Sequence, residues 1–471
     1  MTIDKTTSFP KILTGVNGLD EITNGGFPKG RPVLICGSAG CGKTLLATQF
    51  LVNGIIKYDE PGVFMSFEET AADLTQNVKS LGFDLEKLKA ENKLRVDHVR
   101  VERSEIEETG EYDLEGLFIR LNYAIDSIGA KRVVLDTIES LFGGLNNMAV
   151  LRSEIRRLFL WLKEKGVTAV ITGEKGEATL TRQGLEEYVS DCVILLDFRV
   201  IDQIATRRMR IVKYRGSIHG TNEYPFLIDE DGISVMPVTS LKLDYKSSPD
   251  IISTGLPALD AFFSKKGIYR SSCTLITGTA GTAKTILASY FAMSSCQRNE
   301  PVLYFSFEES PNQLVRNMLT IGIDLQPYID SNLLSIYASR PSLQGLELHL
   351  LTILKLISEV NPRTVIVDPI SSLITIGSDS EVRAMLVRLL DTFKTQQINA
   401  LFTSLNHIQT EQNSENTVGA ISSLADTWIS LRNEDVGDER IRKLLIVKTR
   451  GMGHLNKHQD FIITDDGIKF S

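Results

Sequence analysis

The residues with the clearest chemistry lie in one short segment. Residues 37–44 read Gly-Ser-Ala-Gly-Cys-Gly-Lys-Thr and match the phosphate-binding pattern G-x-x-x-x-G-K-[ST] in full. An apolar run precedes the segment and a run with apolar residues at helical spacing follows it, so the segment connects a predicted strand to a predicted helix. In such a P-loop, backbone N–H groups attract phosphate oxygens, Lys43 reaches the β- and γ-phosphates, and the hydroxyl of Thr44 can bind Mg²⁺. The sequence therefore predicts an ATP site with Mg²⁺ formed by Gly37, Ser38, Ala39, Gly40, Cys41, Gly42, Lys43, Thr44 and Leu45.

The same landmarks return about 240 residues later, in the same order. A second P-loop predicts a second ATP site formed by Gly278, Thr279, Ala280, Gly281, Thr282, Ala283, Lys284, Thr285 and Ile286. A strand end with the sequence Phe-Glu-Glu and a segment Lys-x-Arg-Gly are also repeated. This repetition predicts a tandem duplication of two domains, residues 1–240 and 250–471, with residues 247–249 as the linker.

Two aspartates are predicted to hold the metal ion. Asp136 and Asp368 follow apolar runs and should lie at the carboxyl ends of strands, where ligands of parallel sheets bind. A carboxylate at this position would hold Mg²⁺, directly or through water, beside Thr44 or Thr285. The alternative is an aspartate that only begins a turn.

Adjacent glutamates provide candidates for the general base. The pairs Glu68–Glu69 and Glu308–Glu309 also end apolar strands, and one carboxylate of each pair can polarise a water or a hydroxyl for attack on the γ-phosphate. We interpret Glu68 and Glu308 as the catalytic residues and Glu69 and Glu309 as supporting them. Glu308 is in addition a candidate metal ligand. An alternative for the second glutamate of each pair is stabilisation of a helix N-terminus.

Pairs of cations occur at matching places in the two halves. Lys213 and Arg215 are two residues apart, as are Lys448 and Arg450, so each pair should share one face of a strand. Such cations can stabilise charge on a γ-phosphate bound by the next subunit. The alternative is a charged edge strand that is protected from pairing. Five neighbours complete the predicted ATP sites, although the histidines could equally be surface side chains: Tyr214, Ser217, His219, Thr449 and His454.

The spacing of apolar runs predicts the fold class. In each half, short β-rich runs alternate with helical runs, which is typical of a doubly wound, mostly parallel sheet covered on both faces. An antiparallel hairpin should close each sheet. The strands predicted for the first half are 33–36, 63–66, 95–99, 133–136, 169–172 and 193–197. The predicted hairpins comprise 208–213, 224–228 and the turn 229–232, and in the second half 443–448, 460–463 and the turn 465–467.

The composition limits the classes of function. The net charge is −8 at pH 7, so a broad basic face for duplex nucleic acid is not expected. Five cysteines are scattered without a C-x-x-C pair, which indicates neither a zinc site nor a disulfide framework. No apolar run approaches the roughly 18 residues of a membrane span, and the N-terminus lacks the layout of a signal peptide. We therefore expect a cytoplasmic protein that does not bind membranes.

With these motifs in this order, the sequence resembles the KaiC family of double-domain RecA-like ATPases, known from the circadian clock, nearly from end to end. The resemblance implies two tandem RecA-like P-loop NTPase domains in a two-tiered homohexamer, with ATP at the subunit interfaces. It implies hydrolysis mainly in the N-terminal ring, autokinase and autophosphatase activity in the C-terminal ring, and a KaiB-like partner of the N-terminal ring. It also implies Glu68 and Glu308 as the catalytic carboxylates.

The phosphorylation sites follow from the same resemblance. The adjacent phosphoacceptors of the family follow an isoleucine and precede an Asp-Thr segment, which here implies Ser422 and Ser423 as the sites. The corresponding positions of the first half hold Glu187 and Tyr188, so the second half alone offers paired hydroxyls.

Two departures from the family pattern affect these expectations. Ala283 replaces the last P-loop glycine, and if this position needs a positive φ, its Cβ costs on the order of 1 kcal/mol. This substitution makes nucleotide binding less certain in the second half than in the first. The chain also stops at Ser471, whereas clock-type members carry a C-terminal tail contacted by their activator KaiA, so regulation by KaiA is doubtful.

Two other classes of function use similar ATP sites. A RecA-like DNA-dependent motor would need cationic DNA-binding loops, which the acidic composition disfavours. A nucleotide-gated scaffold, in which hydrolysis is incidental to partner binding, has the same sequence features as the ATPase and autokinase.

Overall fold

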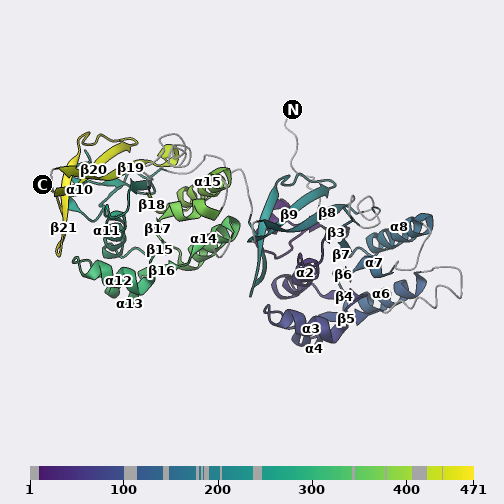
Figure 1. Cartoon of the computed structure of the whole chain (residues 1–471). Coiled ribbons are helices and arrows are strands. Elements are labelled where there is room, and N and C mark those ends of the chain that lie inside the picture. Colours follow the sequence, from purple (N-terminus) through teal and green to yellow (C-terminus); the bar gives the residue numbers. More distant parts are fainter. Residues whose placement is uncertain are drawn as a thin grey trace. The chain divides into compact units, whose positions relative to one another are not determined.

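In the computed structural model the chain divides into two compact units, residues 1–239 and 240–471 (Figure 1). The structure describes the residues 10–99, 114–141, 148–176, 180–181, 184, 190–201, 204–236, 247–341, 345–376, 379–405, 422–436 and 439–470.

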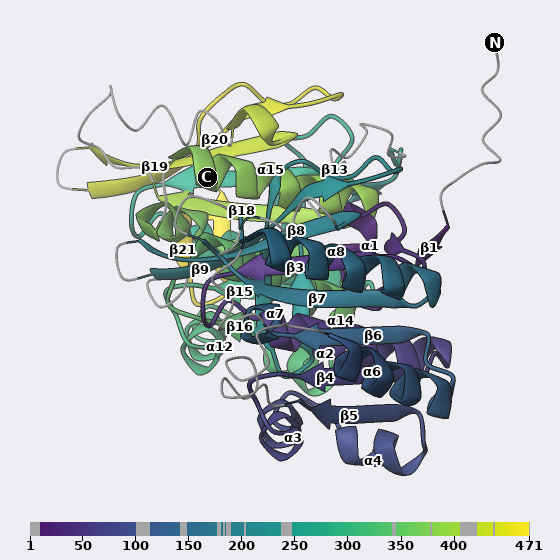
Figure 2. The ribbon, with the colours of Figure 1, turned by 90° about the vertical axis from the view of Figure 1, so that its right-hand side faces the viewer.

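The first unit is built on a nine-stranded sheet with the strand order β11-β10-β9-β8-β3-β7-β6-β4-β5. Figure 2 shows β8, β3, β7, β6, β4 and β5 of this sheet in that order from top to bottom. The six strands β8, β3, β7, β6, β4 and β5 are parallel to one another. Beyond β8, the strands β9, β10 and β11 are added in antiparallel pairs. The bounds are β3 (Pro32–Gly37), β4 (Gly62–Ser66), β5 (Leu94–His98), β6 (Arg132–Asp136), β7 (Thr168–Glu174), β8 (Cys192–Ile201), β9 (Ile204–Tyr214), β10 (Glu223–Asp229) and β11 (Gly232–Val235).

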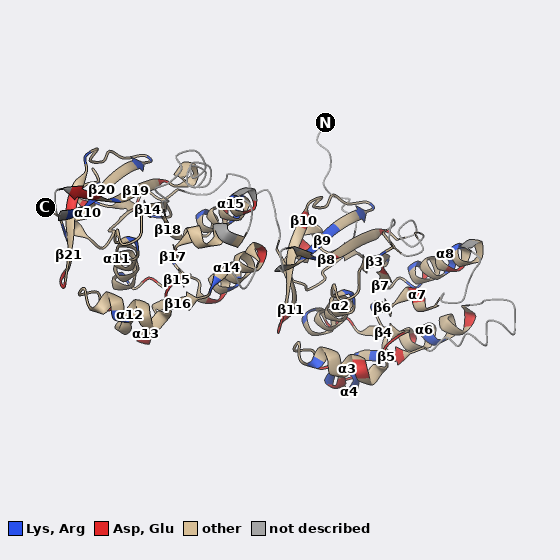
Figure 3. Cartoon of the chain, in the orientation of Figure 1, with Lys and Arg blue, Asp and Glu red and all other residues tan. Residues whose placement is uncertain are grey.

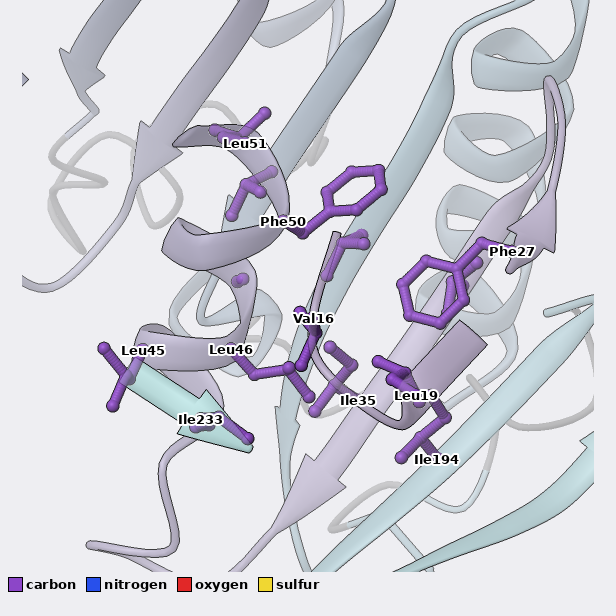
Figure 4. Close-up of a cluster of buried hydrophobic side chains, with 14 of the residues drawn as sticks. Val16, Leu19, Phe27, Ile35, Leu45, Leu46, Phe50, Leu51, Ile194 and Ile233 are labelled. Atoms are coloured by element: carbon purple, nitrogen blue, oxygen red, sulfur yellow. The ribbon is translucent and has the colours of Figure 1, made fainter. Parts of the chain in front are cut away.

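Helices cover both faces of this sheet, because the residues of its central strands are apolar on both sides. Val33 and Ile35 of β3 belong to the core that contains α2, whereas Leu34 and Cys36 pack with α6 and α8 on the opposite face. Figure 4 shows Leu45, Leu46, Phe50 and Leu51 of α2 in the first of these cores. The helices are α1 (Leu19–Ile22), α2 (Lys43–Tyr58), α3 (Ala71–Lys79), α4 (Leu85–Ala90), α6 (Glu115–Ile128), α7 (Ile138–Leu141) and α8 (Met148–Glu164).

The second unit repeats this architecture with the strand order β16-β15-β17-β18-β14-β19-β20-β21-β22. Read from the opposite end, this order is the order of the first sheet, strand for strand. The bounds are β14 (Cys273–Gly278), β15 (Val302–Ser306), β16 (Leu334–Ala338), β17 (Thr364–Asp368), β18 (Asn399–Leu405), β19 (Thr427–Val436), β20 (Glu439–Thr449), β21 (Gln459–Thr464) and β22 (Gly467–Phe470). The duplication and the predicted fold class, two tandem RecA-like domains, are therefore confirmed.

In the second unit, α11 lies on one face of the sheet, and α14 and α15 lie on the other (Figure 1). The helices are α10 (Pro257–Asp260), α11 (Lys284–Gln297), α12 (Pro311–Leu319), α13 (Gln326–Asp330), α14 (Leu346–Val360) and α15 (Asp379–Thr395), with a 3₁₀ helix at Ile370–Ile376. Each unit also has a two-stranded sheet, formed by β1 (Lys11–Ile12) with β2 (Phe27–Pro28) and by β12 (Ile251–Ile252) with β13 (Ile268–Tyr269), which the sequence analysis missed.

The closing part of each sheet is larger than the predicted hairpin. The predicted pairing of 208–213 with 224–228 is present, with Arg210 opposite Glu223. However, β8 itself continues to Ile201 and pairs with β9 over its whole length, and β11 adds a further strand after the turn at 229–232. The charged residues of β8 and β9 interrupt the apolar run, which is why the sequence analysis ended the strand too early.

The surface carries both signs of charge. In Figure 3 basic and acidic residues are interspersed along α3 and α4 of the first unit. Among the described residues, no helix combines the length and the apolar character that a membrane span requires.

Candidate nucleotide sites

The first P-loop connects β3 to α2 as predicted. Nζ of Lys43 donates hydrogen bonds of 3.0 Å to the carbonyls of Gly37 and Ser38, so the ammonium lies over its own loop. A Cβ at Gly37 would lie 2.5 Å from both Cys41 Sγ and the carbonyl oxygen of Leu196, which explains the glycine. Cys41 is buried, and burial raises the pKa of its thiol, so this side chain packs inside the loop. The ammonium and the first N–H groups of α2 give the loop the positive potential that phosphate requires.

Asp136 ends β6 and is held by two hydroxyls. Oγ1 of Thr44 donates to Oδ2 at 2.9 Å, and the hydroxyl of Thr172 donates to Oδ1. The carboxyl is almost wholly buried, and this burial raises its pKa, opposed by the two hydroxyl donors. The structure thus brings together the two predicted metal ligands of the first domain.

The donor set fits Mg²⁺, because a hydroxyl and a carboxylate are hard oxygen ligands. Within the described residues no group of three or more His, Cys, Asp or Glu side chains could hold a metal ion by itself. A metal ion at Thr44 and Asp136 would therefore take its remaining ligands from phosphate and water, as Mg²⁺ commonly does.

The two glutamates that follow β4 have different surroundings. Oγ of Ser140 donates to Oε1 of Glu68 at 2.6 Å, on the side of α7. Glu69 instead faces α3, where Nδ2 of Asn77 lies 3.4 Å from its Oε2. Since α3 begins at Ala71 with Thr70 as its N-cap, Glu69 precedes the helix rather than forming its first turn. The contacts agree with a division of roles between the two carboxylates.

The second P-loop has the same lysine geometry. Nζ of Lys284 donates to the carbonyls of Gly278 and Thr279 at 3.0 and 2.8 Å. Burial lowers the pKa of Lys284, and the charges of the nearby acidic groups oppose this shift. Ala283 has a φ of 78° and Gly42 a φ of 102°, so the position does have a positive φ in both domains.

The carboxylates of the second site are held by partly different donors. The hydroxyl of Thr403 donates to Oδ1 of Asp368, as Thr172 does in the first domain, but Oδ2 accepts a hydrogen bond of 2.7 Å from Tyr304. Burial, followed by the charge of Asp368, raises the pKa of Glu308, and a hydrogen bond with Ser372 opposes this shift. Glu309 resembles Glu69, because its Oε2 lies 3.4 Å from Nδ2 of an asparagine on the following helix.

The predicted cations are engaged within their own domains. Arg215 Nη1 lies 3.6 Å from Oδ1 of Asp191, and Arg450 Nη1 lies 3.6 Å from Oδ1 of Asp426. The arginine side chains are 53% and 54% exposed, which leaves part of each available to another molecule. The prediction that both cations of a pair lie on a strand is wrong in detail, because β9 ends at Tyr214 and β20 ends at Thr449.

The other predicted residues of the first site pack against the N-terminal strands. Tyr214 is buried, and its hydroxyl donates to the carbonyl of Gly26 at 2.8 Å. Lys11 lies over the ring of Tyr214 and donates to the hydroxyl of Ser217, while Nδ1 of His219 is 2.9 Å from the carbonyl of the next glycine. Tyr214 therefore connects the end of β9 to the N-terminal strands through its hydroxyl and its ring.

In the second domain the remaining predicted residues are Thr449 and His454. The hydroxyl of Thr449 lies 3.3 Å from that of Thr427, and His454 forms an isolated bridge with Phe263.

The predicted phosphoacceptors lie next to the cations of their own domain. Ser422 and Ser423 belong to a short helical turn before β19, and Ser423 is exposed. Nζ of Lys448 donates to the carbonyl of Ser422, and Nη2 of Arg450 donates to the carbonyl of Ser423, both at 2.6 Å. Glu187 and Tyr188, their predicted counterparts, lie outside the described residues.

Several site residues escaped the sequence analysis. Thr172 and Thr403 lie near the ends of β7 and β18 at equivalent places, so the rule that selected the aspartates would also have selected them. Ser140 carried no such signal because it belongs to no motif, and Tyr304 lies in the apolar part of the repeated strand that precedes Glu308.

Comparisons with known proteins agree with this geometry. The family model described as "ATPase: KaiC" matches residues 12–240 and 252–471. The chain is 54% identical to the circadian clock protein KaiC2 of Synechocystis sp., over 98% of this chain and 81% of that protein. It is 37% identical to the circadian clock oscillator protein KaiC of Synechococcus elongatus, over 97% of this chain and 88% of that protein. The resemblance noted from the sequence is confirmed, and the chain belongs to the KaiC family of ATPases.

Proposed function

We propose that the protein is a KaiC-like ATPase and serine autokinase and autophosphatase, with ATP bound at the subunit interfaces of a homohexamer. The observation that carries this proposal is one arrangement that occurs in both domains. A P-loop lysine lies over its loop, a buried aspartate ends a strand, and a glutamate after the adjacent strand is hydrogen-bonded to a serine. Both domains therefore have groups for phosphate binding, metal binding and base catalysis.

In the first domain the arrangement is suited to hydrolysis. Lys43 binds the phosphates, and Thr44 and Asp136 are the groups that hold Mg²⁺, which when bound would neutralise charge on the phosphates. Glu68 orients the attacking water and accepts its proton, and the hydrogen bond from Ser140 fixes the direction of this carboxylate.

In the second domain the acceptor is a serine hydroxyl. Glu308 is the base, and Ser422 and Ser423 are the acceptors of phosphate from ATP bound by a neighbouring subunit. A phosphoserine adds about −1.5 to −2 charge at pH 7. Lys448 and Arg450 already bind the backbone of the two serines, so this charge would appear beside two cations.

Assembly follows from the exposed arginines. Arg215 and Arg450 follow β9 and β20, the antiparallel strands that pair directly with the parallel part of each sheet, and about half of each side chain is exposed. We assign them to the γ-phosphate of ATP on the next subunit, where a cation supplied in trans stabilises the transition state. The similar proteins are named for the circadian clock, and we extend to this chain a clock-type signalling role in the cytoplasm and a KaiB-like partner.

Incubation of the 471-residue chain with Mg-ATP tests the proposal. We expect a hexamer in native mass spectrometry, release of inorganic phosphate, and phosphate on Ser422, Ser423 or both in peptide mapping. The variant Ser422→Ala/Ser423→Ala should hydrolyse ATP without becoming phosphorylated, and Glu308→Gln should also abolish phosphorylation.

Different results would contradict different parts of the proposal. Undiminished label in the double alanine variant would exclude these serines as the acceptors. A protein that stays monomeric in saturating Mg-ATP would exclude ATP sites shared between subunits.

A further inference from the structure

The two metal-binding aspartates differ at one oxygen atom. Oδ1 accepts a hydrogen bond from a threonine of the neighbouring strand in both domains. Oδ2 of Asp136 accepts from the P-loop Thr44 at 2.9 Å, whereas Oδ2 of Asp368 accepts from Tyr304 at 2.7 Å. Within the described residues no hydrogen bond joins Asp368 to Thr285, the P-loop threonine of the second domain.

Tyr304 differs from its counterpart in the first domain by one hydroxyl. It lies in the middle of β15, and Phe64 occupies the same place in β4. Both side chains are buried, with 0% and 1% exposure, in the core that contains the P-loop helix. Because a buried hydroxyl requires a partner, Tyr304 is tied to Asp368, and it also interacts with Ser289 of α11.

The position of this hydroxyl bears on the metal ion. At a P-loop the threonine hydroxyl and the strand-end carboxylate act together on Mg²⁺. In the first domain the hydrogen bond between Thr44 and Asp136 holds the two ligands next to each other. In the second domain the corresponding oxygen of Asp368 accepts from Tyr304 instead, so part of its charge is used by the phenol.

We propose that Tyr304 is a positioning residue that separates Asp368 from Thr285 and so weakens the binding of a divalent cation in the second domain relative to the first. The inference rests on the proposed function, in which both domains bind ATP with a divalent cation. Through Tyr304 the two sites therefore differ in their affinity for the cation, although their sequence motifs are nearly the same.

Binding of Mn²⁺ in the presence of a non-hydrolysable ATP analogue tests this inference without any turnover. The full chain with Lys43→Ala reports mainly the second site, and the full chain with Lys284→Ala reports mainly the first. In the former background Tyr304→Phe should tighten Mn²⁺ binding about fivefold, as expected for loss of one competing hydrogen bond. In the latter background Phe64→Tyr should weaken Mn²⁺ binding by a similar factor. Electron paramagnetic resonance measures the free Mn²⁺ in both titrations.

Two controls distinguish this effect from a change in packing. Tyr337→Phe removes a hydroxyl from the adjacent strand β16 without affecting Asp368, and Mn²⁺ binding should not change. Binding of a fluorescent ATP analogue in EDTA should be equal in Tyr304→Phe and its parent, since the cation is absent. A packing defect would instead weaken nucleotide binding in EDTA and lower the unfolding temperature.

The outcomes separate the inference from the proposed function. If the analogue binds to the second site but Tyr304→Phe leaves the Mn²⁺ affinity unchanged, Tyr304 has only a structural role and the inference is wrong. If the Lys43→Ala protein binds no analogue with or without Mn²⁺, the proposed function of the second domain fails, and the inference fails with it. If only Phe64→Tyr alters the Mn²⁺ affinity, the hydroxyl has the proposed effect in the first domain but not at Asp368, and the assignment to Tyr304 is overturned.

Discussion

Arg132 and Thr364 begin equivalent strands of the two domains, and their surroundings differ. Arg132 is fully buried, pairs with Glu60 at 2.6 Å, donates to the carbonyls of Phe50 and Leu13, and lies over the ring of Phe50. Thr364 is smaller and carries no charge, and its hydroxyl is 2.8 Å from that of Ser295 on α11. The first domain thus joins its N-terminal segment to β6 through a buried charge, whereas at the same place in the second domain two hydroxyls join α11 to β17.

The space for the arginine comes from a glycine. A Cβ at Gly54 would lie 2.3 Å from Nε of Arg132, and the second domain has Ser295 at this place beside the smaller threonine. In the second domain Glu300 pairs with Arg298 and Arg270 instead, both partly exposed. Because the sheet order is the same in both domains, this exchange in the core leaves the topology unchanged.

Two other arginines, Arg215 and Arg450, have the same surroundings in both domains. Arg215 and Arg450 face a buried or half-buried aspartate at the same distance of 3.6 Å and are about half exposed. The comparison teaches that this part of the core differs between the domains, whereas the two arginines assigned to the nucleotide of a neighbour have the same geometry.

The largest expected effect concerns Arg215 and Arg450. Arg215→Ala should slow hydrolysis in the first domain by about 10³-fold, since a cation supplied in trans is typically worth this much or more. Arg450→Ala should leave that hydrolysis intact and abolish phosphorylation of the serines. Phosphate release and phosphopeptide mapping on the two variants measure both effects.

Mixed hexamers show whether Arg215 acts in trans. Neither Glu68→Gln nor Arg215→Ala should hydrolyse ATP alone in the first ring. In a mixture, an interface between the intact Glu68 of one variant and the intact Arg215 of the other should be active. No recovery on mixing, with exchange of subunits verified by mass, would place the arginine in its own subunit's site or outside catalysis.

A second prediction separates the tasks of the two bases. Glu68→Gln should lower total ATP hydrolysis about 100-fold or more, because general bases contribute at least this factor. Glu308→Gln should remove a minor share of hydrolysis and all of the phosphorylation. Glu69→Gln is the matched control, since its side chain faces α3, and it should retain more activity than Glu68→Gln. Equal hydrolysis in the Glu68→Gln protein and its parent would exclude Glu68 as the base.

A third prediction addresses the buried charge of the first domain. Arg132→Ala leaves Glu60 and two backbone carbonyls without their partner, and should destabilise the first domain by about 3 kcal/mol. Thr364→Ala should cost the second domain about 1–2 kcal/mol, because its hydroxyl has two partners, Ser295 and Asn399. Hydrogen exchange of β6 and β17 reports each domain separately. Equal losses of protection in the two variants would show that the charge network stabilises its domain no more than the hydroxyl of Thr364 does.

The sequence predicted the parallel strands and the motifs at their ends well, because both depend on local patterns. Gly37 to Thr44 specify a P-loop by residue type and spacing, and the strand that ends at Asp136 is an uninterrupted apolar run. Contacts between distant residues were missed. Ser140 reaches Glu68 across 72 residues and Tyr304 reaches Asp368 across 64, and no local pattern encodes either pair. The buried state of Arg132 was equally hidden, since an arginine before an apolar run normally indicates an exposed strand end.

The smallest effect concerns the last residue of each P-loop before its lysine. Ala283 has a φ of 78°, a conformation that costs a residue with a Cβ about 1–2 kcal/mol. A glycine would remove this strain but add about 0.5–1 kcal/mol of unfolded-chain entropy, so Ala283→Gly should stabilise the second domain by about 0.5–1 kcal/mol. Gly42→Ala should destabilise the first domain by a similar amount, with Ile228 Cδ1 moving away from a Cβ at 3.1 Å.

The same substitution also tests whether the strain at Ala283 lowers the affinity of the second domain for ATP. Ala283, with its positive φ, is the N-cap of α11, so we expect its strain to be a cost of forming this helix rather than of binding ATP. Hydrogen exchange of α11 should therefore slow in Ala283→Gly while the affinity for an ATP analogue stays the same. A tighter affinity without added protection would show instead that the loop of the second domain becomes strained only when it closes around phosphate.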